Sequence, residues 1–70
     1  MSVWPATKAS RVLAALLLIG WRVKRRSGSH RVLSKEGYTD FVFAWHDRDE
    51  VRPALLRWVG RQTGLRPEDL

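Results

Sequence analysis

The sequence contains no cysteine and only two histidines. Without cysteine, a disulfide scaffold and a zinc site built on thiolates are both excluded. With only two histidines a metal site is not expected either, and we predict no other cofactor. A chain of 70 residues has room for one small domain, whose stability must come almost entirely from apolar packing.

The sequence also lacks a hydrophobic run long enough to span a membrane. Its longest apolar run, Val12 to Ile19, is preceded by Lys8 and Arg11 as in a signal peptide, but it is too short to cross a bilayer. The basic segment Trp21 to Arg26 follows, where a secretory signal would have small residues and a cleavage site. We therefore predict no membrane association, and a cytoplasmic location in preference to export.

Negative charge is scarce. The chain has 7 Asp and Glu against 13 Lys and Arg, a formal net charge of +6. Six of the basic residues fall within one short stretch: Arg22, Lys24, Arg25, Arg26, Arg31 and Lys35. This clustering predicts a surface that faces a polyanion, with nucleic acid favoured over an acidic protein and an anionic membrane. An ordinary solvated surface is the alternative.

Two segments have helical periodicity. In the first, apolar residues recur every three or four positions, at Ala9, Val12, Leu13, Leu16 and Ile19. We predict a helix from Lys8, capped by Thr7 and stopped by Gly20, with Leu17 and Leu18 partly exposed as an apolar patch.

The second helix is predicted to start at Pro53, which suits a first helical turn, and to end at Gly64. Its apolar stripe consists of Leu55, Leu56, Val59 and Thr63. Leu65 follows Gly64 in the position of the hydrophobic contact that often accompanies a helix C-terminal cap.

Between the helices the pattern is that of strands. We predict strands at Trp21 to Arg26, His30 to Ser34 and Tyr38 to Trp45, separated by turns at Ser27-Gly28 and Lys35 to Gly37. In the third strand Phe41, Phe43 and Trp45 point to the core. Because the connections are short, the strands should form an antiparallel meander.

The predicted fold is therefore α+β, in the order α-β-β-β-α, with two helices packed on one face of a three-stranded antiparallel sheet. Residues 1–70 form a single domain, with a flexible lead-in over residues 1–6 and a tail over residues 66–70. The other sheet face is left to solvent or ligand.

His30 is the leading candidate for chemistry. Leu33 is the better core residue, so His30 should point to the open face with the basic side chains. Histidine exchanges protons near neutral pH, which suits removal of a proton from a ribose 2′-hydroxyl or protonation of a departing 5′-oxygen. The alternative is a strand histidine satisfied by hydrogen bonds or water.

The remaining candidates surround it. Phosphate contacts are predicted for Arg22, Lys24, Arg26, Ser29 and Arg31. His46, beside Asp47 in a polar loop, is a secondary candidate. A serine nucleophile at Ser29 is not favoured, because no acidic group completes an evident triad.

The chain resembles the HicA-type mRNA interferase toxins of HicAB toxin-antitoxin systems over roughly residues 8 to 69, with a core at 8–65. The residues that carry the resemblance are Val12-Leu13, Leu16, Gly20-Trp21, Gly28-Ser29-His30, Leu33, His46, Glu50-Val51, Leu56-Arg57 and Arg61-Gln62-Thr63-Gly64-Leu65. Gly-Ser-His and Arg-Gln-x-Gly are each common alone, but their order and spacing together are a fairly strong signal.

The resemblance implies a double-stranded-RNA-binding-like (dsRBD-like) fold and mRNA cleavage that needs neither metal nor ribosome, with His30 as the catalytic residue. It also implies a HicB-type antitoxin that covers the active site. The chain departs from the usual pattern where Ala54-Leu55 replaces Gly-Thr behind Pro53, and where Ala44 replaces a frequent proline. These changes affect helix entry and strand exit and leave His30 untouched.

Three functions remain open at this point. The first is an RNA endonuclease that cuts mRNA at His30. The second is a non-catalytic RNA-binding module of the same fold, which would grip RNA through its shape and phosphates. The third is an adaptor whose basic face meets an acidic partner.

Overall fold

The computed structural model of the protein describes residues 3–70, and all of its helices and strands lie in that range. In chain order the elements are β1 (Thr7–Lys8), α1 (Ala9–Leu18), β2 (Arg22–Ser27), β3 (His30–Ser34), β4 (Phe41–Phe43), β5 (Glu50–Val51), α2 (Pro53–Thr63) and a short 3-10 helix, η1 (Pro67–Asp69).

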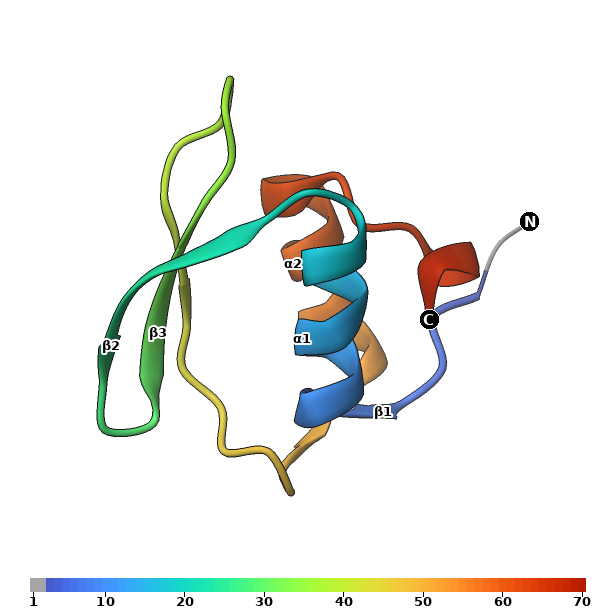
Figure 1. Ribbon diagram of the computed structural model, residues 1–70. Coiled ribbons are helices and arrows are strands. Elements are labelled where there is room, and N and C mark those ends of the chain that lie inside the picture. The colour runs from blue at the N-terminus through green and yellow to red at the C-terminus, as the bar shows by residue number, and fades with distance from the viewer. Residues whose placement is uncertain (1–2) are drawn as a thin grey trace.

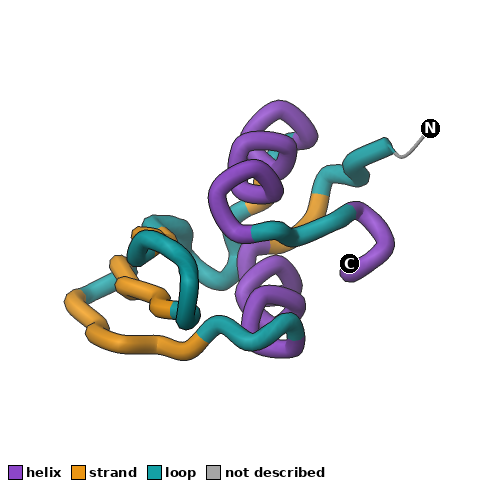
Figure 2. Tube along the Cα trace, turned by 90° about the horizontal axis from the view of Figure 1, so that it is seen from above, coloured by secondary structure: helices purple, strands orange, loops and turns teal. Residues whose placement is uncertain are grey.

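The main sheet has the order β2-β3-β4 and is antiparallel throughout. Both long helices lie on the same side of it, and the β2–β3 hairpin reaches away from them (Figure 1). Seen from above, the strands of the main sheet lie to one side and the two long helices to the other (Figure 2). This arrangement confirms the predicted α+β fold.

The second sheet was not predicted from the sequence. It has only two strands, in which Thr7 of β1 pairs with Val51 of β5 and Lys8 pairs with Glu50. Val51 is fully buried and Thr7 is nearly so. The pairing therefore fixes the start of α1 beside the start of α2.

The predicted cap of α1 is wrong. Lys8 is the N-cap residue and makes no side-chain capping bond, whereas the Thr7 hydroxyl donates to the Pro5 carbonyl at 2.7 Å. The first amides of α1 are satisfied from another segment, because Ala9 N–H donates to Asp49 O at 2.8 Å and Ser10 N–H to Asp47 O at 3.1 Å. These bonds hold the loop that follows β4 against the helix.

The predicted limits of α2 are confirmed. Pro53 occupies its first turn, and Gly64 closes it in the left-handed conformation with φ of 80°, which glycine adopts without steric cost. Leu56, Val59 and Thr63 are buried along its inner face. Leu55 was assigned to this stripe but is 38% exposed, so it lies at the edge of the stripe.

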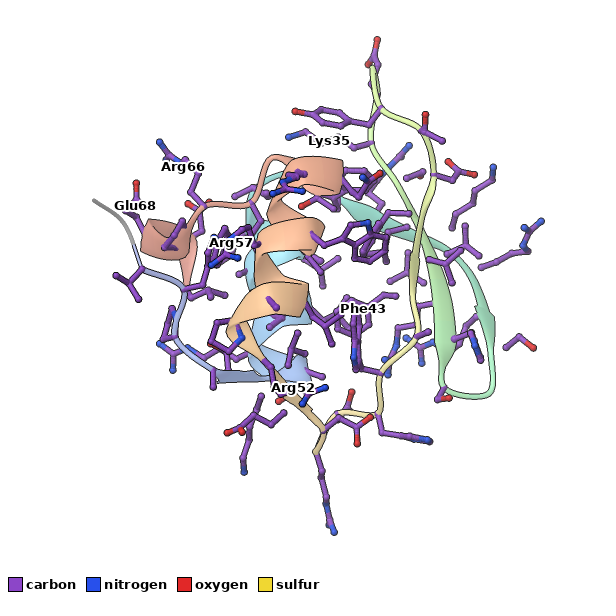
Figure 3. All side chains as sticks on the ribbon, turned by 180° about the vertical axis from the view of Figure 1, so that it is seen from behind. Lys35, Phe43, Arg52, Arg57, Arg66 and Glu68 are labelled. Atoms are coloured by element: carbon purple, nitrogen blue, oxygen red, sulfur yellow. The ribbon has the colours of Figure 1, made fainter. Side chains whose placement is uncertain are left out.

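The core fills the space between the sheet and the helices. Trp21 is buried, and its indole N–H donates to Thr63 O at 3.1 Å, which joins the start of the hairpin to the end of α2. Trp21 itself precedes β2, so this strand begins one residue later than predicted. Phe43 is fully buried and points from β4 toward α2 (Figure 3).

The third strand is shorter than predicted. Tyr38 to Asp40 belong to the preceding loop, and Ala44 and Trp45 follow β4 without regular structure. Trp45 still packs against the core, with its ring 5.1 Å from that of Phe43 in an edge-on arrangement. The Trp45 side chain therefore points to the core, as predicted, although the residue itself is not part of β4.

Both ends of the described chain contribute to the packing. Trp4 and Leu70 are partly buried against the core, and the Trp4 ring approaches Gly60 on α2. Met1 and Ser2 of the predicted lead-in lie outside the described residues. At the end of α1, Leu17 and Leu18 are 44% and 86% exposed, as expected. No helix within residues 3–70 is long and apolar enough to cross a membrane.

Candidate functional site

The β2–β3 hairpin presents His30 at its tip. Its turn consists of Gly28 and Ser29, and Gly28 has φ of 59°, in the left-handed region that a tight turn requires. His30 is the first residue of β3 and pairs with Ser27, the last residue of β2. The turn therefore determines the position of His30 at the tip of the hairpin.

His30 lies on the sheet face that points away from the helices. Leu33 is fully buried among the core residues, and side chains alternate between the faces of a strand. His30, Val32 and Ser34 therefore share the outer face, while Arg31 shares the inner face with Leu33. The outward direction expected for His30 agrees with its exposure.

A β-bulge in β2 decides which basic residues accompany His30. The register shifts between Val23 and Arg25, so that Val23 pairs with Leu33 and Arg25 with Val32. A bulge inserts one extra residue and reverses the alternation beyond it. Because paired residues share a face, Arg25 lies on the outer face with His30.

The predicted phosphate-binding residues are consequently divided. Arg22 pairs with Ser34 and lies on the outer face. Lys24 lies within the bulge, where its ammonium forms an ion pair with Asp40 at 2.8 Å. Arg26 is opposite Arg31 on the inner face. The structure thus groups Arg22 and Arg25 with His30, and it separates Arg26 and Arg31 from them.

Arg31 has an unusual environment for a cation. Its side chain is only 15% exposed and contacts Asp47 through Nη2 at 3.3 Å. Its Nε and Nη1 atoms are buried without a hydrogen-bond partner. Buried donors normally have hydrogen-bond partners. The Arg31 guanidinium departs from this rule, because only its Nη2 atom has a partner.

An open pocket of about 380 Å³ adjoins this arginine. It is lined by Gly28, Ser29, Arg31, Trp45, His46 and Asp47. Ser29 and His46, both predicted from the sequence, meet in this pocket. The backbone N–H of His46 donates to Asp49 Oδ2 at 2.9 Å, and this bond shapes the loop that forms the pocket wall.

The site therefore has two parts that meet at the hairpin turn. The outer face carries an exposed imidazole at the hairpin tip, and Arg25 and then Arg22 follow at increasing distance along the same face. These groups can bind the phosphates of a polyanion and transfer protons next to one of them. Behind the turn, the pocket offers an aromatic ring, a cation and a carboxylate.

The sequence model of the family described as HicA toxin of bacterial toxin-antitoxin matches residues 9–65 of this chain. The chain belongs to the HicA toxin family. As a HicA toxin it is the toxin component expected of a toxin-antitoxin pair, and the family implies a cognate antitoxin as its partner. No curated protein and no solved structure matched the chain significantly.

The structure brings three residues to this candidate site that were not predicted as site residues from the sequence. Arg25 was left out because simple alternation from Arg22 selects Lys24 and Arg26, and nothing in the sequence marks the bulge. Trp45 was assigned only to the core, and Asp47 only to a loop. The adjacency of an aromatic, a histidine and a carboxylate at residues 45–47 was the available signal.

Proposed function

We propose that this HicA toxin is an mRNA interferase, an RNA endonuclease with His30 as its catalytic residue. The observation that carries the proposal is the position of His30, exposed at a hairpin tip on a face that it shares with Arg22 and Arg25. Family membership supports the toxin part of the proposal directly. The chemistry rests on the histidine and its basic surroundings.

In the proposed reaction, the 2′-hydroxyl of one ribose attacks the adjacent phosphorus. His30 takes the hydroxyl proton or protonates the departing 5′-oxygen, and solvent water makes the other of these two proton transfers. The P–O5′ bond breaks as the new P–O2′ bond forms, which leaves a 2′,3′-cyclic phosphate and a free 5′-hydroxyl. Arg25, the nearer of the two arginines along the hairpin, neutralises charge that develops on the phosphoryl oxygens. Arg22 binds a phosphate farther along the RNA, and no metal ion or other cofactor takes part.

The other predicted residues have supporting roles in this proposal. Arg26, Lys24 and Arg31 add positive potential around the hairpin, which attracts RNA without contacting the scissile phosphate. Ser29 lies at the turn, where its hydroxyl can donate to a neighbouring phosphate. His46 is a secondary candidate, which acts from the pocket side and not from the outer face.

The antitoxin is proposed to be a HicB-type protein that covers the outer face of the hairpin. A surface with this excess of positive charge is complementary to an acidic partner. Covering His30 would block access of RNA and so neutralise the toxin. With an RNA substrate and such a partner, the proposed location is the cytoplasm.

Growth of cells that express the chain without an antitoxin tests this function. We expect wild-type protein to arrest growth and His30→Ala to permit it, because general acid-base catalysis contributes about 10²- to 10⁴-fold to rates. Glu36→Ala, at an exposed position of the loop between β3 and β4, serves as the control and should retain the toxicity, and His46→Ala tests the secondary candidate in the same assay. Equal arrest by wild type and His30→Ala would refute the catalytic role.

The second candidate function is a non-catalytic RNA-binding module of the same fold. One observation favours it: the His30 imidazole forms no hydrogen bond or ion pair with any residue in the described part of the chain, so no partner orients it before RNA binds. A binding module would retain RNA affinity and leave the RNA intact. Gel analysis of RNA incubated with the purified chain distinguishes the two functions.

A further inference from the structure

The pocket behind the hairpin turn has a chemistry that differs from the outer face. It places a carboxylate, Asp47, beside the Nη2 atom of Arg31 at 3.3 Å, with the half-buried ring of Trp45 as another part of its lining. The Asp47 side chain is 62% exposed. A phosphate would be repelled by this carboxylate, so a neutral ligand with hydrogen-bond donors fits better.

We propose that this pocket binds one unstacked guanine base of the RNA and gives the proposed endonuclease its base preference. The inference rests on the proposed function for its RNA substrate. Unpaired bases are commonly recognised by stacking on aromatic side chains and by hydrogen bonds to their Watson–Crick edge. Trp45 supplies the ring, and Arg31 with Asp47 supplies the polar contacts.

Guanine is selected by the order of donors and acceptors. Its Watson–Crick edge presents two adjacent donors, N1–H and the 2-amino group, beside the O6 acceptor. A carboxylate accepts both donors, and the neighbouring guanidinium donates to O6. Adenine, cytosine and uracil each place an acceptor next to their single donor, which would face a lone pair toward the carboxylate.

The state of Arg31 supports a ligand at this point. Two of its three nitrogens are buried without partners, and its single contact with Asp47 is long for a charge-assisted bond. A guanidinium held in this way keeps Nη2 at the pocket with capacity for a further acceptor. The Asp47 backbone is also fixed, because its carbonyl accepts the Ser10 N–H of α1.

The position of the pocket relates the bound base to the reaction. Gly28 and Ser29 line it, and Ser29 is the chain neighbour of His30. A strand that crosses the hairpin tip would therefore place one base in the pocket and a nearby phosphate at His30. The base preference is expected at a nucleotide that flanks the cleaved bond.

Binding of synthetic RNA tests the inference separately from catalysis. The probe is a short 2′-O-methyl oligouridine with one central guanosine, which lacks the 2′-hydroxyl nucleophile of the proposed reaction. A matched probe carries inosine, which lacks only the 2-amino group. Fluorescence anisotropy with the full chain should give about tenfold weaker binding of the inosine probe, the effect of losing one specific base contact.

Asp47→Asn is the decisive variant, because the side chain is exposed and keeps its size. Its amide has one acceptor oxygen where the carboxylate has two, and its NH2 group would face one of the guanine donors, so the preference for guanosine over inosine should fall to less than about twofold. Asp40→Asn is the control, since it removes an ion-paired carboxylate away from the pocket and should keep the wild-type preference.

Equal binding of the two probes by wild type, or a preference that survives Asp47→Asn, would overturn the guanine pocket. A guanosine preference in a chain that cleaves no RNA would refute the proposed endonuclease and leave the pocket standing. Cleavage without any base preference would support the endonuclease and refute the guanine pocket.

Discussion

The β-bulge in β2 leads to the sharpest prediction about RNA contacts, because it places Arg25 on the face of His30 and Arg26 on the opposite face. Replacing Arg25 with Gln should therefore weaken RNA binding more than the same replacement of Arg26. Both variants change the net charge equally, so non-specific attraction falls by the same amount in each. The difference between them reports position on the sheet.

The magnitude follows from counterion release. Each phosphate contact to single-stranded RNA contributes about 0.7 to the slope of log affinity against log salt concentration. Arg25→Gln should reduce that slope by about this amount and weaken binding at low salt by up to about fivefold, as expected for one exposed ion pair. Arg26→Gln should change the slope by clearly less.

The assay is anisotropy of a labelled, uncleavable oligouridine titrated with each variant at several salt concentrations. Arg57→Gln is the background control, because Arg57 lies on the side of α2 that points away from the sheet (Figure 3). Equal slopes for Arg25→Gln and Arg26→Gln would refute the assignment of faces. A larger effect of Arg26→Gln would show that RNA follows the inner face.

Three further predictions concern the packing of the two helices that support the sheet, and thermal unfolding checks each of them. Gly60→Ala would bring a Cβ within 2.7 Å of the Trp4 ring and 2.8 Å of a backbone oxygen, so overpacking should exceed the helix-propensity gain and lower the melting temperature by about 5–15 °C. Gly64→Ala should destabilise by about 1–2 kcal/mol, because φ is 80° and the Tyr38 hydroxyl lies 3.0 Å from the new carbon. Leu18→Ser, at a side chain 86% exposed, should change stability by less than about 0.5 kcal/mol. A stable Gly60→Ala or Gly64→Ala, or an unstable Leu18→Ser, would show that the packing described at that residue is wrong.

The features that could be predicted from sequence are those set by local chemistry. Pro53 and Gly64 bound α2 because proline favours a first helical turn and glycine adopts the left-handed conformation that ends one. Likewise, the apolar alternation around Leu33 and Phe43 was sufficient to identify the strands of the main sheet. Each of these residues influences the backbone conformation only within a few positions of itself, so its effect can be predicted from the local sequence.

The features that were missed depend on contacts between distant segments. Pairing of Thr7 with Val51 involves two-residue strands whose pattern is too short to recognise, and it explains why Thr7 does not cap α1. The bulge near Lys24 likewise leaves no signal in the residue pattern of β2. Because the bulge reverses the alternation within β2, Arg25 and not Arg26 shares the outer face with His30. The bulge does not affect β3, so His30 lies on the face that was predicted for it.

The catalytic role of His30 is central to the proposed function, and the ends of the RNA products test it. Purified chain should be incubated with an unstructured RNA in the presence of EDTA, and the fragments analysed by mass spectrometry. We predict fragments that end in a 2′,3′-cyclic phosphate, formed about 10²- to 10⁴-fold more slowly by His30→Ala. Intact RNA with the wild-type chain, or identical cleavage by His30→Ala, would contradict the account.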